Sequence, residues 1–167
     1  TIEFSAFSDC TGLTSIEIPS SVTYIGDYAF SGCTGLTSIE IPDSVTLMGS
    51  SPFSGCTGLT SIVVDENNTV YDSRNGCNAI IETATNTLIS GCQNTIIPNG
   101  VVTIATSAFR GHSKLKNIEI PSSVTSIANN VFLYCSSLTS IEIPSSVTSI
   151  GGSVFSYCTS LANITVS

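Results

Sequence analysis

A unit of 23 residues that recurs along the chain constrains the fold more than any other feature. A phenylalanine marks each copy, and the period holds on both sides of one longer step: Phe7, Phe30, Phe53, Phe109, Phe132 and Phe155. Five prolines follow the same rule: Pro19, Pro42, Pro98, Pro121 and Pro144. A fixed period of about 20–50 residues is the signature of a solenoid. We therefore expect coils stacked along one axis, with like side chains in contact.

The copy that begins at Leu36 shows how a coil is built. Ile39, Glu40 and Ile41 alternate apolar and polar side chains, which is typical of a half-buried strand. Pro42 has no amide hydrogen to continue a sheet, so the strand ends there. One coil cannot bury its own apolar face, whereas stacked coils can.

We expect seven such strands in one parallel sheet, over a length of about 30 Å at the usual strand spacing. They are Thr14–Ile18, Thr37–Ile41, Thr60–Val64, Thr95–Ile97, Asn117–Ile120, Ser140–Ile143 and Asn163–Val166.

The longer step, from Asp65 to Pro98, covers 33 residues and is rich in turn-forming residues. Within it, two short apolar runs, Ala79–Glu82 and Thr87–Ser90, flank the polar link Thr83–Asn86, which predicts a β-hairpin. Insertions in repeat proteins gather on one face, often the binding face. The unit is therefore either part of a binding surface or an elaboration that packs over the core.

The pattern Leu36-x-x-Ile39-x-Ile41-Pro42-x-x-Val45, followed by Ala-Phe and Cys, resembles the leucine-rich repeats of the BspA-like (Treponema pallidum-type) bacterial surface proteins over essentially the whole chain. The resemblance implies a leucine-rich repeat solenoid of the α/β horseshoe type, a right-handed superhelix. It places a parallel sheet on the concave face, and short strands, turns and 3-10 or short helical pieces on the convex face. The longer unit resembles a variant within that family.

A solenoid extends its core linearly, so residues 1–167 are expected to form a single leucine-rich repeat domain. It has 23-residue repeats over 1–64 and 95–167 and the longer unit over 65–98. Neither end shows an atypical capping unit, so we expect a fragment of a larger protein. Exposed terminal strands would then allow end-to-end self-association.

Five of the seven cysteines share one repeat position, three residues before the leucine: Cys10, Cys33, Cys56, Cys135 and Cys158. Neighbours in that column lie within disulfide range. The count is odd, however, and His112 takes the same position in a fourth coil, so we expect free buried thiols. Cys77 and Cys92 lie outside the column, and a bond between them stays open.

The net charge and the lengths of the apolar runs argue against two kinds of partner, nucleic acid and the membrane interior. The net charge is −8 with four Lys and Arg residues, which argues against nucleic acid. No apolar run approaches the length of about 20 residues needed to span a bilayer, so no membrane insertion is expected in this fragment.

The strand position between the two inward apolar residues should lie on the concave side. Along the stack it reads Glu17, Glu40, Val63, Ile96, Glu119, Glu142 and Thr165, here called the acidic strip. The glutamates either recruit a basic partner or a cation, or keep the sheet soluble. The apolar middle, Val63 and Ile96, predicts a docking site for a protein partner beside the hairpin. The candidate partner-binding residues are therefore Glu17, Glu40, Val63, Ile96, Glu119 and Glu142.

No catalytic, cofactor or metal site is expected. The one histidine, His112, takes a position otherwise filled by structural cysteine, and neither a phosphate loop nor zinc-ligand spacing is present. Asp65, Glu66 and Asp72 could offer oxygen ligands to Ca²⁺, but turns rich in Asn and Asp form without a metal. A basic group of Arg110, Lys114 and Lys116 is either a site for an anionic glycan or lipid or a chance surface cluster.

Three functional hypotheses follow. The first is a non-enzymatic adhesion module of a secreted or cell-surface bacterial protein that binds a host extracellular or bacterial surface protein; adhesion and location are implied by the family resemblance. The second is a structural spacer in a larger surface protein. The third, a polysaccharide-active enzyme on a parallel β-helix, needs clustered Asp, Lys or Arg on one sheet face, where this chain has Glu, Thr and Ser.

Overall fold

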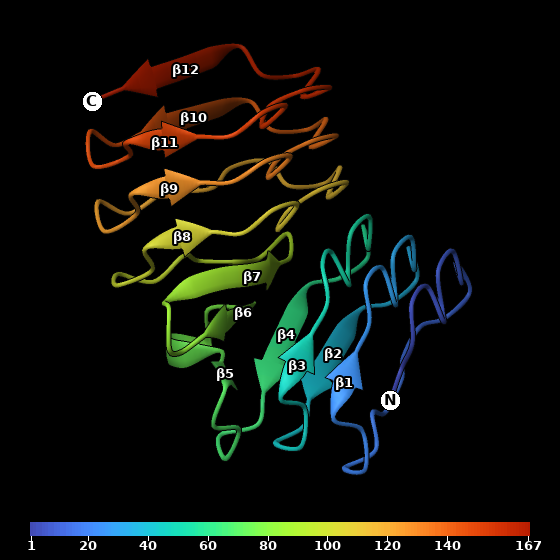
Figure 1. The fold of residues 1–167 in the computed structure, drawn as a ribbon. Helices are drawn as coiled ribbons and strands as arrows, with labels where there is room; N and C mark the ends of the chain where they lie inside the picture. Colours follow the sequence, from blue (N-terminus) through green and yellow to red (C-terminus); the bar gives the residue numbers. More distant parts are fainter.

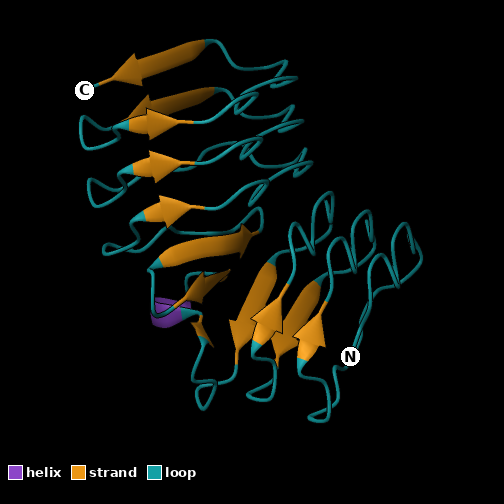
Figure 2. Ribbon diagram, in the orientation of Figure 1, coloured by secondary structure: helices purple, strands orange, loops and turns teal.

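The computed structural model describes residues 1–167, which form a solenoid of short strands and turns (Figures 1 and 2). The solenoid predicted from the period is confirmed. The strands are β1 (Tyr24–Ile25), β2 (Ser38–Ile41), β3 (Leu47–Met48), β4 (Ser61–Val64), β5 (Tyr71–Asp72), β6 (Ala79–Glu82), β7 (Thr87–Gly91), β8 (Thr103–Ile104), β9 (Ser126–Ile127), β10 (Ser140–Ile143), β11 (Ser149–Ile150) and β12 (Asn163–Val166). The one helix is a 3-10 turn, η1 (Arg74–Gly76).

The repeat period sets the register of the parallel pairs. β2 pairs with β4 and β10 with β12, each residue opposite the one 23 positions along the chain, so that Ile39 meets Ile62. In β2 the exposure alternates along the strand, with Ile39 and Ile41 buried and Glu40 exposed. Like apolar side chains therefore stack inside the solenoid, as the alternation predicts.

The segment from three residues before to three residues after each phenylalanine, here called the Phe turn, is a series of tight turns rather than a helix. Each of the six Phe turns holds two residues with positive φ, two positions before and two positions after the phenylalanine; in the second coil these are Tyr28 (φ 55°) and Gly32 (φ 73°). A right-handed helix cannot contain such residues. The short helical pieces expected on the convex side are consequently replaced by turns.

Two stacks of phenylalanine rings fill the core beside these turns. Phe7, Phe30 and Phe53 stack at centroid distances of 5.2 and 5.4 Å. Phe109, Phe132 and Phe155 stack at 5.3 and 5.7 Å. Offset parallel rings at such distances are a favourable aromatic arrangement.

The predicted column of free thiols is confirmed. All seven cysteines are unbonded, and all but Cys10 are buried. The Sγ of Cys33, Cys56, Cys135 and Cys158 each lies 3.0–3.1 Å from the carbonyl oxygen of the phenylalanine one coil earlier. Burial raises the pKa of the Cys56 thiol to about 12. These thiols therefore stay protonated near neutral pH and donate weak hydrogen bonds between coils.

The longer unit, residues 65–98 and here called the wedge, contains the predicted hairpin. β6 and β7 pair antiparallel, β5 extends them, and β7 joins the parallel strands β8, β9 and β11 in a six-stranded sheet. Ile80 packs into one apolar cluster with residues of the first coils, whereas Ala79 and Ile81 pack into a second cluster with the last coils. The uninterrupted apolar run of β6 is thus explained by burial on both faces.

The wedge divides the molecule into an N-terminal stack (residues 1–64) and a C-terminal stack (residues 99–167). In Figure 1 the strands of the two stacks point in different directions, and the hairpin lies between them. Each stack has its own apolar cluster.

The prediction of seven strands in one continuous sheet is wrong. Four of the seven are present, as the separate pairs β2–β4 and β10–β12. Where strands were expected at 14–18 and 117–120, one backbone hydrogen bond to the next coil remains at the start of each segment, from the N–H of Thr37 to Thr14 O and from that of Thr139 to Lys116 O. Residues 95–97 lie within the wedge, where the Ile96 N–H donates to Cys77 O instead of to a repeat strand.

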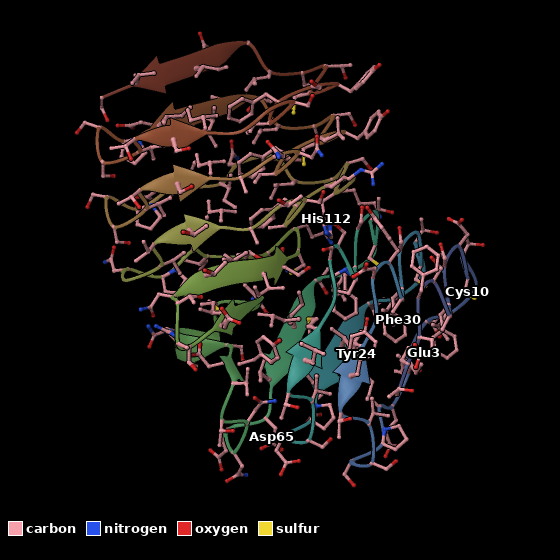
Figure 3. All side chains as sticks on the ribbon, in the orientation of Figure 1. Glu3, Cys10, Tyr24, Phe30, Asp65 and His112 are labelled. Atoms are coloured by element: carbon pink, nitrogen blue, oxygen red, sulfur yellow. The ribbon has the colours of Figure 1, made fainter.

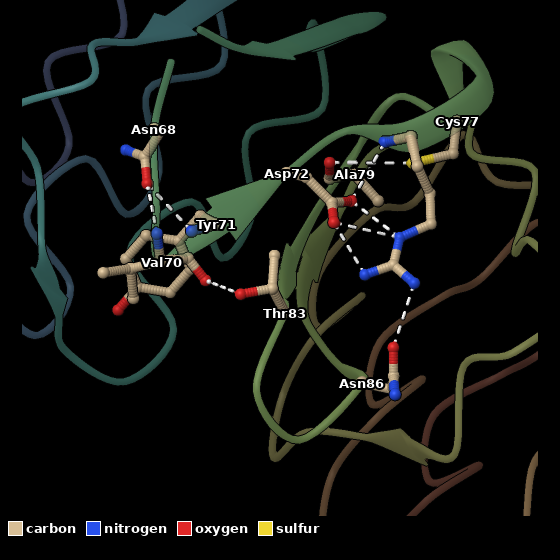
Figure 4. Close-up of polar contacts among 9 residues, drawn as sticks. Asn68, Val70, Tyr71, Asp72, Cys77, Ala79, Thr83 and Asn86 are labelled. Carbon is tan, nitrogen blue, oxygen red and sulfur yellow. Dashed lines mark hydrogen bonds and ion pairs between the residues drawn. The ribbon is translucent and has the colours of Figure 1, made fainter. Parts of the chain in front are cut away.

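Asn68 fastens the wedge to the N-terminal stack. Its Nδ2 donates to the carbonyl oxygens of Pro42 and Val45, and its Oδ1 accepts the N–H groups of Val70 and Tyr71 (Figure 4). All four bonds are 2.8–2.9 Å long, and the side chain is buried.

Replacing Asn68 by alanine should therefore lower the free energy of unfolding by about 1–3 kcal/mol, because four backbone groups lose their partner. Urea denaturation of both proteins measures the loss. Asn67→Ala, one residue away and exposed, is the control and should change little. Equal losses at the two positions would contradict this account.

Candidate functional site

The outward strand positions carry the six candidate partner-binding residues, and all six are exposed: Glu17, Glu40, Val63, Ile96, Glu119 and Glu142. Their placement between buried neighbours follows from the period-two alternation. They do not, however, form one surface. Five of them line two hollows that share no residue, and Val63 lines neither.

The N-terminal hollow, of about 590 Å³, lies on the strand side of the first coils. Its lining includes four carboxylates, Glu17, Glu40, Asp43 and Asp65, together with several serines, and it includes no lysine or arginine. No ion pair neutralises these groups, since the single salt bridge of the molecule lies elsewhere. The hollow therefore presents an uncompensated negative charge.

The C-terminal hollow, of about 930 Å³, runs from the wedge across the next coils. Glu119 and Glu142 line it, with the exposed side chain of Ile96 and the amides of Asn75 and Asn99. Here too the lining has no basic residue. This hollow combines two carboxylates with neutral hydrogen-bonding groups and an apolar contact.

The apolar window expected from Val63 and Ile96 is not continuous. Val63 stands in β4 opposite Glu40, beside the N-terminal hollow, and lines neither hollow. Other residues of the wedge lie beside each of them: the Val64 N–H donates to Ser73 Oγ and the Ile96 N–H to Cys77 O. The two side chains are exposed, at 47% and 73%, but Val63 belongs to the N-terminal stack and Ile96 to the wedge.

Sequence reasoning missed the two aspartates of the N-terminal hollow and the asparagines of the C-terminal one. Asp65 could have been found, because it stands one period after Pro42, in the position that proline fills in five other coils. A residue at that position directly follows the strand and reaches the same face. Asn75 could not, because its place depends on how the wedge folds against the next coil.

The charged residues of the wedge serve the hairpin. Arg74 forms a two-pronged ion pair with Asp72, with Nη2 to Oδ2 at 2.6 Å, and its Nη1 donates to Asn86 Oδ1 (Figure 4). This contact joins η1 to the end of the hairpin. Asp72 is thus engaged by a guanidinium rather than open to a cation, and Asp65 Oδ1 accepts the backbone N–H of Asn67. Asp72 and Asp65, considered earlier as calcium ligands, have these partners.

His112 lies where the two stacks meet (Figure 3). It is 1% exposed, and neither ring nitrogen has a hydrogen-bond partner. Burial lowers the pKa of the imidazole to about 4. The ring is therefore neutral at physiological pH, and its burial keeps it from contact with a substrate.

Stacked coils of 23 residues, an apolar ladder inside and an exposed strand face define a leucine-rich repeat protein. A family model for the BspA type leucine rich repeat region matches residues 1–88 and 86–167, with six copies. The chain belongs to this family.

Solved structures agree with this assignment. A leucine-rich repeat protein from Eubacterium ventriosum is 30% identical, with a TM-score of 0.80 over 91% of this chain and 41% of its own. A leucine rich cell surface protein from Faecalibacterium prausnitzii is 27% identical, with a TM-score of 0.54 over 99% of this chain and 62% of its own. The leucine-rich repeat protein of T. pallidum is 27% identical, with a TM-score of 0.57 over 96% of this chain and 71% of its own.

This chain therefore spans less than two thirds of the length of the first two proteins. The comparison with curated proteins gives no match. None of the helical structure in the chain has the length and apolar character of a membrane span.

Proposed function

We propose that this chain is a protein-binding module of a bacterial surface protein, and that its hollows take a basic segment of the partner. The observation that carries the proposal is the N-terminal hollow, in which four carboxylates surround a concave surface without a counter-charge. Acidic concave surfaces concentrate field lines and attract positively charged groups. The net charge of −8 acts in the same direction over a longer range.

Family membership supports a binding role and a place on the cell surface. Repeat solenoids expose extended faces that suit the binding of other proteins. One similar structure is described as a cell surface protein. We extend that description to the present chain and propose adhesion through its exposed strand face.

The test uses two synthetic peptides of equal length, one rich in lysine and arginine and one rich in glutamate, titrated by calorimetry at low and high salt. We expect binding of the basic peptide alone, weakening as salt rises, because charges separated by more than about 10 Å are screened at ordinary ionic strength. A structural spacer would bind neither peptide, and that result would remove the proposal.

The double variant Glu17→Gln and Glu40→Gln locates the site. It should weaken binding of the basic peptide by about tenfold, or 1.4 kcal/mol. The control, Glu3→Gln and Glu66→Gln, removes the same charge at exposed residues outside both hollows and should leave affinity nearly unchanged. Equal weakening would show that only net charge matters. The pair Glu119→Gln and Glu142→Gln tests the C-terminal hollow in the same way.

A further inference from the structure

The contact between the Phe turns of Phe53 and Phe109 differs from every other contact between Phe turns. Within each stack, three backbone hydrogen bonds join successive Phe turns. The Tyr28, Phe30 and Gly32 N–H groups donate to the turn of Phe53, and the Ser107, Phe109 and Gly111 N–H groups donate to the turn of Phe132. Between the turns of Phe53 and Phe109 one such bond remains, from the Gly55 N–H to Arg110 O at 2.8 Å.

The wedge causes this loss. By the repeat pattern the Phe53 N–H would donate to Ala108 O, since each phenylalanine N–H donates to the residue before the next phenylalanine. That carbonyl oxygen instead accepts the N–H of Gly91, at the end of β7. The ring of Phe109 also packs over Gly91, where an added Cβ would lie 2.2 Å from the ring. The hairpin therefore replaces the preceding coil as the neighbour of Phe109.

Three other regular features of the solenoid are also interrupted at this contact: the stacks of phenylalanine rings, the parallel sheets and the apolar core. Phe53 and Phe109 do not stack, whereas the remaining neighbouring pairs do. Both parallel sheets of the N-terminal stack, β1–β3 and β2–β4, end without pairing to the later coils. The apolar core separates into two clusters.

The unpaired buried polar atoms gather here as well. The molecule has three buried side-chain polar atoms without a partner: Oγ of Ser51 and both ring nitrogens of His112. Ser51 lies in the Phe turn of Phe53 and His112 in that of Phe109. Such groups cost free energy while the contact stays closed, so they favour its opening.

We propose that this contact is the opening side of a hinge: the N-terminal stack tilts away from the C-terminal stack by bending at the wedge, and the Gly55–Arg110 bond breaks. The wedge is bound to both stacks, to the C-terminal one through the pairing of β7 with β8 and to the N-terminal one through Asn68, so the bending lies within the wedge. At the contact itself the two backbones meet without side chains that interlock them: Gly55 and Gly111 approach so closely that a Cβ on Gly111 would lie 2.9 Å from Gly55 Cα. The tilt changes the distance between the two hollows.

The first test measures distances between spin labels. Ser38→Cys and Ser140→Cys place labels on exposed residues of the two stacks, and Lys116→Cys with Asn163→Cys places both labels on exposed residues of the C-terminal stack. Cys10→Ser in both removes the single exposed native thiol. We expect a distance distribution across the hinge at least twice as broad as the control. Equal widths would overturn the proposal.

The second test compares three glycines that hold the same repeat position. The N–H groups of Gly32, Gly55 and Gly111 each donate to the next Phe turn, at 2.8 Å. Local opening at the hinge should make the Gly55 amide exchange with solvent deuterium about 100-fold faster than the other two. Equal protection of all three would overturn the proposal, because the contact cannot open while its one backbone hydrogen bond is as protected as the bonds within the stacks.

Discussion

Replacement of Phe30 by alanine is expected to lower the free energy of unfolding by about 3–5 kcal/mol. The ring is fully buried and lies between two others, at 5.2 Å from Phe7 and 5.4 Å from Phe53. Its removal leaves a cavity that the rigid turns on either side cannot close. Urea denaturation followed by circular dichroism measures the loss.

The two separate apolar clusters add a second expectation for Phe30→Ala. Phe30 belongs to the N-terminal cluster alone, so the amide of Gly32 should lose protection from hydrogen exchange while that of Gly111 retains it. Phe7→Ala is the control, since Phe7 is only partly buried and stacks on one ring. An equal loss at Phe7, or a uniform loss of protection, would contradict the two-cluster description.

The second large effect concerns pH. Burial lowers the pKa of His112 to about 4, against 6.5 in an unfolded chain. Above pH 6.5 neither state binds the proton, so stability is unaffected. As the pH falls from 6.5 to 4, the unfolded chain takes up the proton and the folded one does not. His112 therefore lowers the free energy of unfolding in this window, by about 3 kcal/mol in total at about 1.4 kcal/mol per pKa unit.

The variant His112→Cys isolates this contribution, because it restores the residue that the other coils have at this position. Carboxylates also titrate in this range, so the measurement is the difference between the two stability curves from pH 7.5 to 4. We expect the difference to shift in favour of the variant by about 3 kcal/mol as the pH falls. Parallel curves would show that the imidazole is protonated inside the folded protein.

Local regularities of the sequence predicted much of this structure. The 23-residue period places Phe30 on Phe53, and the alternation of Ile39, Glu40 and Ile41 predicts which side chains are buried. The shared position of His112 and the cysteines predicts its burial. Each of these predictions depends only on one coil resembling the next.

The continuity of the sheet could not be predicted in this way. Residues 14–18 and 37–41 have the same sequence, Thr-Ser-Ile-Glu-Ile, yet only the second contains a strand. Pairing along a whole strand depends on the angle between neighbouring coils, which no single repeat encodes. The strand direction changes at the wedge (Figure 1), where the Gly91 N–H donates to the carbonyl oxygen of Ala108 that the repeat pattern would give to Phe53. For the same reason the residues of the acidic strip are exposed one by one but do not form one surface.

The thiol column affects how the chain can reach its native state. The buried cysteines act through hydrogen bonds to carbonyl oxygens rather than through covalent bridges. The native fold consequently needs neither an oxidant nor a disulfide isomerase to form. In oxidising surroundings the thiols stay unpaired only once folding has buried them, so rapid stacking of the coils protects the chain from bridges that the native state does not contain.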